Sequence, residues 1–104
     1  MSKEVYIIAQ IQVKDYPTYF KEYALKFKDI LPAFQGEVLS ATTKAEVIEG
    51  TSYGNWTVLI KFPSLELAHA CIHSEEYAPL AAIRINELTT GNNVFIIPAK
   101  KQEN

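Results

Sequence analysis

Arg84 is the residue with the clearest potential for chemistry, because a guanidinium in a partly apolar cleft is suited to bind a carboxylate or an enolate. Tyr77 precedes it, and the expected fold could bring Glu49 near the same helical region. Ion-pair networks also place arginines in this way, so Arg84 paired with Glu49, Glu76 or Glu87 is the competing interpretation. The candidate ligand-binding residues are Arg84, Tyr77, Tyr19, Glu49 and Trp56.

His69 and His73 have a spacing at which two imidazoles on one helix face can share a divalent metal. A metal site needs at least a third ligand, and the sequence has no His-Glu-x-x-His arrangement. The pair also falls on the side opposite Ala68 and Cys71, where solvated residues belong. We therefore expect surface histidines and no metal site.

Cys71 is expected to face the core, where a lone cysteine behaves as a small hydrophobe. A nucleophilic thiol would need a neighbouring base, and His69 and His73 point to other faces of the helix. Ser64 and Ser74 are explained as helix N-caps. The sequence therefore assigns no catalytic residue.

The composition indicates one ordinary domain over residues 1–104. A formal net charge of -2 and the absence of long Lys/Arg runs argue against a nucleic-acid partner. No apolar run approaches the roughly 18 residues of a membrane helix. A single cysteine and the lack of a signal-peptide pattern favour the cytoplasm.

Period-2 and helical patterns alternate along the chain. Residues 5–13 and 56–62 alternate as strands, 37–44 form a less regular strand, and 94–97 form a last strand after the stop signal of residues 90–93. A first helix follows Asp15, and a second helical region follows Ser64 and resumes after Ser74. Residues 46–56 predict a connection with a short extended piece at 47–48, and residues 99–104 a frayed tail.

The first helix carries an aromatic stripe that predicts core packing rather than a ligand site. Leu25 falls on its charged side, as a scattered surface residue or part of an interface. The stripe consists of Tyr16, Phe20, Tyr23, Ala24, Phe27, Leu31 and Phe34.

The order β-α-β-β-α-β predicts an α+β, ferredoxin-like fold, a four-stranded antiparallel sheet with helices on one face. The other face would expose an apolar patch, which usually marks an interface. We expect a homodimer in which two sheets face each other. The residues expected on this face are Tyr6, Ile8, Gln10 and Leu59, with some of Phe95, Ile96 and Ile97.

A series of short motifs in this order resembles the family catalogued as domain of unknown function 1330, within the dimeric α+β barrel superfamily. The motifs are Asp15 to Tyr23 with Tyr19, Gly36, Glu49-Gly50, Phe62-Pro63-Ser64 with Ala68, Ser74, Glu76-Tyr77 and Arg84. The resemblance implies a ferredoxin-like fold that pairs into a dimeric barrel. It implies no established activity.

The chain departs from that family's pattern at three positions. The family usually has a second glycine at the position of Gln35, a basic residue near the position of Ala41 and an aromatic residue at the position of Cys71. A shared pocket that used those side chains would be altered here.

Two functions follow as hypotheses. The first is a homodimeric module that binds a small apolar or carboxylate-bearing molecule in a cleft between helices and sheet. The second, by fold analogy, is a cofactor-independent enzyme similar to the superfamily's monooxygenases and isomerases, in which Arg84, Tyr77 and Tyr19 orient substrate or transfer protons. No cofactor is expected, and no histidine is predicted to face inward as a haem ligand would.

Overall fold

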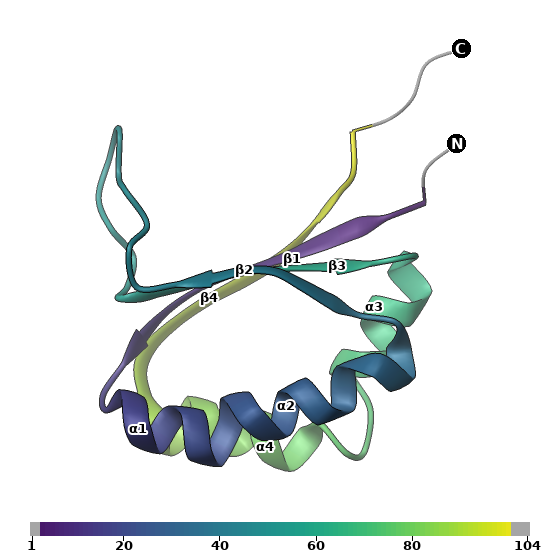
Figure 1. Ribbon diagram of the computed structural model, residues 1–104, viewed down its shortest axis with the longest axis horizontal. Coiled ribbons are helices and arrows are strands. Elements are labelled where there is room, and N and C mark those ends of the chain that lie inside the picture. Colours follow the sequence, from purple (N-terminus) through teal and green to yellow (C-terminus); the bar gives the residue numbers. More distant parts are fainter. Residues whose placement is uncertain (1–2, 101–104) are drawn as a thin grey trace.

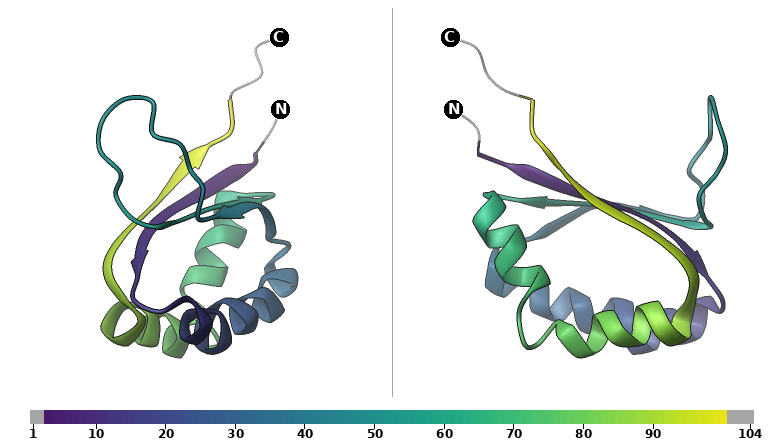
Figure 2. Two further views of the ribbon diagram at one scale, coloured as in Figure 1. Left: turned by 60° about the vertical axis from the view of Figure 1, so that its left-hand side comes forward. Right: turned by 180° about the vertical axis from the view of Figure 1, so that it is seen from behind.

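The computed structural model describes residues 3–100 and consists of a sheet layer above a helix layer (Figures 1 and 2). The strands are β1 (Val5–Val13), β2 (Glu37–Thr42), β3 (Trp56–Phe62) and β4 (Thr89–Pro98). They pair antiparallel in the order β2-β3-β1-β4, which confirms the predicted ferredoxin-like α+β fold. Residues 101–104, in the predicted frayed tail, lie outside the described residues.

Two helical regions cover one face of the sheet. The first joins α1 (Tyr16–Tyr19), the π-helical η1 (Phe20–Ala24), α2 (Leu25–Ile30) and the 3-10 turn η2 (Leu31–Phe34). The second contains α3 (Leu65–Ile72), α4 (Ala78–Ile83) and the π-helical η3 (Arg84–Leu88). Figure 2 shows both regions on the same side of the sheet.

The predicted caps start the helices. The Asp15 carboxylate accepts from Thr18 N–H at 3.1 Å, and Pro17 occupies the first turn, where its missing N–H leaves no bond unmade. The Ser64 hydroxyl accepts from Leu67 N–H at 3.1 Å, and the Ser74 hydroxyl from Tyr77 N–H at 3.2 Å. Local sequence chemistry therefore sets where the helix layer begins.

Alternate residues of the central strands form the core against the helices. In β1 these are Val5, Ile7, Ala9, Ile11 and Val13, all buried as predicted. In β3 Ile60 and Phe62 lie opposite Ile7 and Val5, and Trp56 lies opposite Ile11. The period-2 pattern thus identified the face that the helices cover.

The prediction that residues 90–93 stop a helix before a strand at 94–97 was wrong about the strand boundary. β4 begins at Thr89, and Gly91, Asn92 and Asn93 pair with β1. Turn-forming residues are in the strand because their backbones complete the β1 ladder, and tertiary pairing outweighs local propensity. As a result Asn92 lies on the sheet face that looks toward the helices, in register with Ile11.

The segment between β2 and β3 projects away from the helix layer (Figure 1). It forms no strand at the predicted extended piece of Val47 and Ile48, and Ile48 is 88% exposed. Asn55 fixes its return to the sheet. The Asn55 side chain accepts from Val13 N–H at 2.8 Å and donates to Val13 C=O at 3.0 Å, as a neighbouring peptide unit would.

The outer face of the sheet is not covered by helices. Tyr6, Ile8 and Gln10 alternate with the buried residues of β1 and are half-buried. Phe95 lies opposite Ile8 and is 46% exposed, whereas Ile96, also considered for this face, is half-buried and packs against the core on the other side. The predicted apolar face therefore exists and combines residues from β1, β3 and β4.

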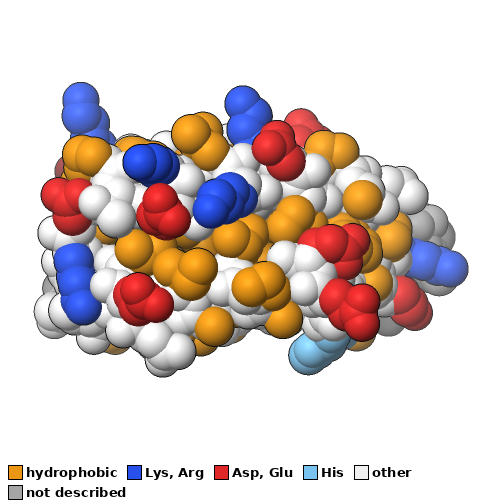
Figure 3. Space-filling model, turned by 90° about the horizontal axis from the view of Figure 1, so that it is seen from below, with side chains coloured by type: hydrophobic (Ala, Val, Ile, Leu, Met, Phe, Trp, Pro, Cys, Tyr) orange, Lys and Arg blue, Asp and Glu red, His pale blue; other side chains and the backbone are white. Residues whose placement is uncertain are grey.

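The outer surface of the helix layer combines charged and apolar side chains. Figure 3 shows hydrophobic side chains along its middle, bordered by charged ones of both signs. None of the helices formed by residues 3–100 is long and apolar enough to cross a membrane.

Candidate ligand-binding site

Arg84 opens the π turn η3 and is buried between the layers, with 6% of its surface exposed. Its guanidinium lies over the Tyr23 ring, 5.5 Å from Cζ to the ring centroid, and Nη2 donates to the Tyr77 hydroxyl at 3.4 Å. Nη1 donates to Asn92 Oδ1 at 2.5 Å. The cation is therefore held by neutral groups.

A ring of hydrogen bonds at the start of β4 sets the direction of the guanidinium. Asn92 Nδ2 donates to Thr89 Oγ1 at 2.8 Å, which leaves Asn92 Oδ1 facing Arg84. The Thr89 hydroxyl donates to the backbone carbonyl of Arg84 at 2.7 Å. Side chain and backbone of Arg84 are thus tied to one short segment of strand.

No carboxylate within residues 3–100 lies within 4 Å of the Arg84 nitrogens. The predicted ion pair with Glu49, Glu76 or Glu87 is not formed. Glu49 is exposed on the projecting segment, on the side of the sheet away from the helices (Figure 1). The structure brings Arg84 and Tyr77 together, as predicted, but does not bring Glu49 to them.

The polar set around Arg84 has more donors than acceptors. Arg84 Nε–H is buried and has no hydrogen-bond partner. The Tyr23 and Tyr77 hydroxyl oxygens lie 2.7 Å apart, so one of their two hydrogens forms that bond. The other has no acceptor among the hydrogen bonds of the described residues. An acceptor oxygen placed here would satisfy donors that the protein leaves unmatched.

Burial keeps the phenols of Tyr19 and Tyr23 protonated. It raises the pKa of Tyr19 to about 12, against smaller opposing effects of Arg84 and Trp56, and raises the pKa of Tyr23 well above its ordinary value. Burial opposes the charged form of Arg84, but the nearby oxygens of Tyr23 and Tyr77 outweigh it, so the Arg84 pKa stays above its ordinary value. At neutral pH the site presents a cation and hydrogen-bond donors.

A cavity of about 240 Å³ lies beside this set, between the helices and the sheet. We call it the inner cavity. Arg84, Tyr77 and Tyr23 supply its polar groups, and the rest of its lining is almost entirely hydrocarbon and aromatic ring from both layers. It can therefore hold an apolar group close to the unmatched donors.

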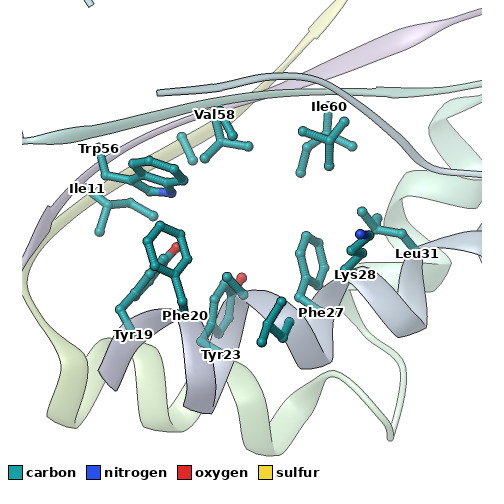
Figure 4. A pocket seen from close by; sticks show the side chains of 15 residues that line it. Ile11, Tyr19, Phe20, Tyr23, Phe27, Lys28, Leu31, Trp56, Val58 and Ile60 are labelled. Carbon is teal, nitrogen blue, oxygen red and sulfur yellow. The ribbon is translucent and has the colours of Figure 1, made fainter. Parts of the chain in front are cut away.

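A second cavity, of about 380 Å³, lies under β1, β2 and β3 on the side of the first helical region. We call it the aromatic cavity. Figure 4 shows Trp56, Val58 and Ile60 facing it from the sheet, and Tyr19, Phe20, Tyr23 and Phe27 from the helices. Tyr23 and Phe27 line both cavities. The predicted residues Tyr19 and Trp56 thus belong to this second space, apart from Arg84.

The remaining candidates lie elsewhere. Cys71 is buried, and burial raises the pKa of its thiol to about 11, so it remains a protonated, core-facing thiol. His69 and His73 are exposed and stacked, with ring centroids 5.6 Å apart. In the part of the chain that the structure describes, no three or more possible metal-ligating side chains are grouped.

Sequence reasoning missed Tyr23, Asn92 and Thr89 as members of the polar set. Tyr23 was assigned to the core stripe, which is correct for its ring, but its hydroxyl contacts Tyr77. Asn92 lies within the segment interpreted as a stop signal, residues 90–93, and Thr89 directly precedes it. A usable signal was the Asn92-Asn93 pair in a strand otherwise rich in β-branched residues, because a buried amide needs a polar partner.

Both helical regions contain a π turn at the site. In η1 the N–H of Leu25 bonds the carbonyl of Phe20, five residues back, and this turn carries Tyr23. In η3 the π turn begins with Arg84. Such turns are frequent at functional sites because the extra residue redirects side chains.

Comparison with known proteins supports the fold and the family pattern. Residues 4–99 match a family model described as Domain of unknown function (DUF1330). A search of curated protein sequences finds no significant match.

Three similar solved structures share the fold at low sequence identity. RPA0582, a protein of unknown function from Rhodopseudomonas palustris, is 12% identical, with a TM-score of 0.75 over 98% of this chain and 86% of that one. SnoaB, a cofactor-independent oxygenase from Streptomyces nogalater, is 16% identical, with a TM-score of 0.66 over 97% of each chain. A dimeric ferredoxin-like protein of unknown function from Thermobifida fusca is 11% identical, with a TM-score of 0.62 over 94% of this chain and 92% of that one.

Proposed function

The chain belongs to the family described as Domain of unknown function (DUF1330), and we propose that it binds a small, mostly apolar molecule through an oxygen atom that accepts hydrogen bonds from Arg84 and the Tyr23–Tyr77 pair. The ligand lies between the helix layer and the sheet.

One observation carries the proposal: Arg84 is buried beside an apolar cavity with no carboxylate partner and with Nε–H unmatched. A buried donor without an acceptor destabilises a fold by about 1–3 kcal/mol, and more when it is charged. A ligand oxygen removes that cost on binding. A site of this kind favours a carboxylate, a ketone or an enolate over a pure hydrocarbon.

Isothermal titration calorimetry with three ligands of one ring system tests this. The probes are 2-naphthoate, 2-acetylnaphthalene and naphthalene, which share the apolar body and differ in the acceptor oxygen. We expect the carboxylate and the ketone to bind at least tenfold more tightly than naphthalene, a difference of about 1.4 kcal/mol.

Tyr23→Phe keeps the ring and removes the hydroxyl, so it is the variant least prone to disturb packing. We expect it to weaken the carboxylate and the ketone by about three- to tenfold and to leave naphthalene unchanged, since a net hydrogen bond contributes about 0.5–1.5 kcal/mol. Tyr53→Phe, on the projecting segment, is the control. Equal affinity for all three probes would contradict the proposal.

A cofactor-independent oxygenase is the second candidate, since the fold is shared with SnoaB. The unmatched donors could stabilise the enolate oxygen that such a reaction forms from its substrate. The described lining offers no obvious base, because burial raises the pKa values of Tyr19, Tyr23 and Cys71. Oxygen uptake with 2-tetralone, an enolisable ketone, tests it. No uptake above the rate without protein eliminates catalysis on this substrate class.

We also infer that this single domain forms a homodimer through the outer face of its sheet. The support is the apolar patch that Tyr6, Ile8, Leu59 and Phe95 form there, because exposed apolar patches usually mark interfaces. The similar protein from Thermobifida fusca is described as dimeric.

A further inference from the structure

The aromatic cavity opens at an edge of the sheet. β2 is the edge strand, and its residues Val38 and Ala41 line the cavity while remaining exposed. Across the opening, the first helical region contributes Leu25, which is 59% exposed, and Lys28. A small molecule can therefore enter between β2 and α2 without unfolding either element.

The interior of the aromatic cavity is formed by rings held at fixed angles. The Phe20 ring meets Trp56 edge to face, with centroids 5.2 Å apart at 81°. The Tyr23 and Phe27 rings stack, with centroids 5.6 Å apart at 20°. Flat faces and edges of this kind favour aromatic ligands over flexible chains, because ring pairs add to the free energy of area burial.

Lys28 is the cation among the residues that line this cavity. It is exposed, and within residues 3–100 no acidic side chain lies within 4 Å of its ammonium group. Other lysines nearby differ: Lys26 pairs with Glu22 at 3.7 Å on the same helix. Figure 4 places Lys28 beside Leu31, at the border of the cavity. An unpaired cation at the mouth of an apolar space favours an anionic group on whatever occupies it.

We propose that the aromatic cavity binds an aromatic anion, with the ring system between Trp56 and Phe27 and the anionic group at Lys28. This assignment rests on the proposed function only for the inner end of the ligand. There Tyr23 lines both cavities, and its hydroxyl belongs to the pair that has one hydrogen without an acceptor. The ligand class is then a planar molecule with an anionic group at one end and an acceptor oxygen at the other.

Two dyes with one carbon skeleton test the charge requirement. 1-Anilinonaphthalene-8-sulfonate carries a sulfonate, and N-phenyl-1-naphthylamine lacks it. Trp56 is the single tryptophan of the chain and lines the cavity, so energy transfer from Trp56 to each dye reports that the dye has bound within range of it. We expect the sulfonate dye to bind about two- to fivefold more tightly than the neutral dye, as one exposed ion pair allows.

Lys28→Gln should weaken the sulfonate dye by the same factor and leave the neutral dye unchanged. Lys26→Gln is the matched control, because Lys26 is on the same helix, pairs with Glu22 and does not line the cavity. Ala41→Lys adds a second cation on the other side of the mouth, at an exposed position that does not threaten folding, and should tighten the sulfonate dye alone.

Equal affinities for the two dyes, or a sulfonate affinity that Lys28→Gln and Lys26→Gln lower equally, would overturn the assignment. Failure of energy transfer from Trp56 despite binding would show that the dyes occupy another place. These outcomes are independent of Tyr23→Phe and the naphthalene probes, so the two proposals can fail separately.

Discussion

Tyr19 and Tyr23 make the free energy of unfolding depend on alkaline pH. Burial raises the pKa of Tyr19 to about 12, so the folded state favours the neutral phenol. The contribution to stability is complete below the pKa of an unfolded tyrosine, near 10, and is lost as the pH rises toward the folded pKa. Burial of Cys71 raises the pKa of its thiol from near 9 to about 11, so its contribution to the free energy of unfolding is also lost as the pH rises over that range.

We expect Tyr19→Phe to flatten this dependence. Urea unfolding of the unmodified protein should lose about 2–3 kcal/mol between pH ~10 and ~12 from Tyr19 alone, since one pKa unit corresponds to about 1.4 kcal/mol. Tyr53→Phe is the control, because Tyr53 is 64% exposed. An identical alkaline slope in Tyr19→Phe and the unmodified protein would show that the Tyr19 phenol is solvated.

For individual residues, the sequence predicted which side chains belong to the site better than it predicted which of them contact one another. Arg84 and Tyr77 were identified from chemistry that the residues carry wherever they lie. Glu49 was included because the fold could bring it close, but its position depends on the path of a projecting segment that has no periodicity. Tyr23 was missed because a stripe shows which face of a helix is buried and not which hydroxyl meets a guanidinium.

Asn55 shows how one side chain fixes the end of an element. Its side-chain amide bonds the backbone of Val13 as a neighbouring strand would. Its backbone N–H donates to Ile11 C=O at 3.0 Å, and its backbone C=O accepts from the Tyr16 hydroxyl at 2.6 Å. Gly54 comes so close to the Ile11 backbone that an added Cβ would lie 2.4 Å from its carbonyl oxygen. The projecting segment therefore returns to the sheet at one defined point.

Asn55→Ala should destabilise the protein by about 2–3 kcal/mol, because it removes the side-chain partner of the N–H and C=O of buried Val13. Chemical denaturation measures the loss. Asn93→Ala removes an exposed amide from β4 and should change stability by less than about 0.5 kcal/mol. Equal effects at the two positions would contradict the role assigned to Asn55.

The order and type of elements followed from local patterns, but the boundary of β4 did not. The caps at Asp15 and Ser64 and the alternation in β1 and β3 are short-range patterns, and the structure contains the elements that they predict. Gly91 and Asn92 have turn propensity, and only their pairing with β1 holds them extended. That pairing joins distant parts of the chain, so a local pattern cannot show it.

The whole molecule has one covered and one uncovered sheet face, and the uncovered face sets the expected assembly. Ile8→Glu places a charge between Phe95 and Leu59, its neighbours on β4 and β3. We expect sedimentation velocity at micromolar concentration to give the mass of two chains for the unmodified protein and of one chain for Ile8→Glu.

Leu65→Glu is the control for the dimer, because Leu65 is an exposed apolar residue, 47% exposed, that lies on α3 in the helix layer. It should retain the mass of two chains. A single-chain mass for the unmodified protein would refute the dimer and leave the ligand sites, which lie between the layers of one chain, unaffected.

The positions of Tyr23 and Arg84 depend on the number of residues in the two π turns. A π turn holds one residue more than an α turn, so deleting one residue from η1 or η3 would restore a regular helix, keep the flanking turns in register and shift the side chains that the π turn itself carries. Tyr23 or Arg84 would then leave the donor set while the layers stayed in place. A relative one residue shorter in either helix would keep this fold and recognise a different ligand, so insertion and deletion, as well as substitution, can change specificity here.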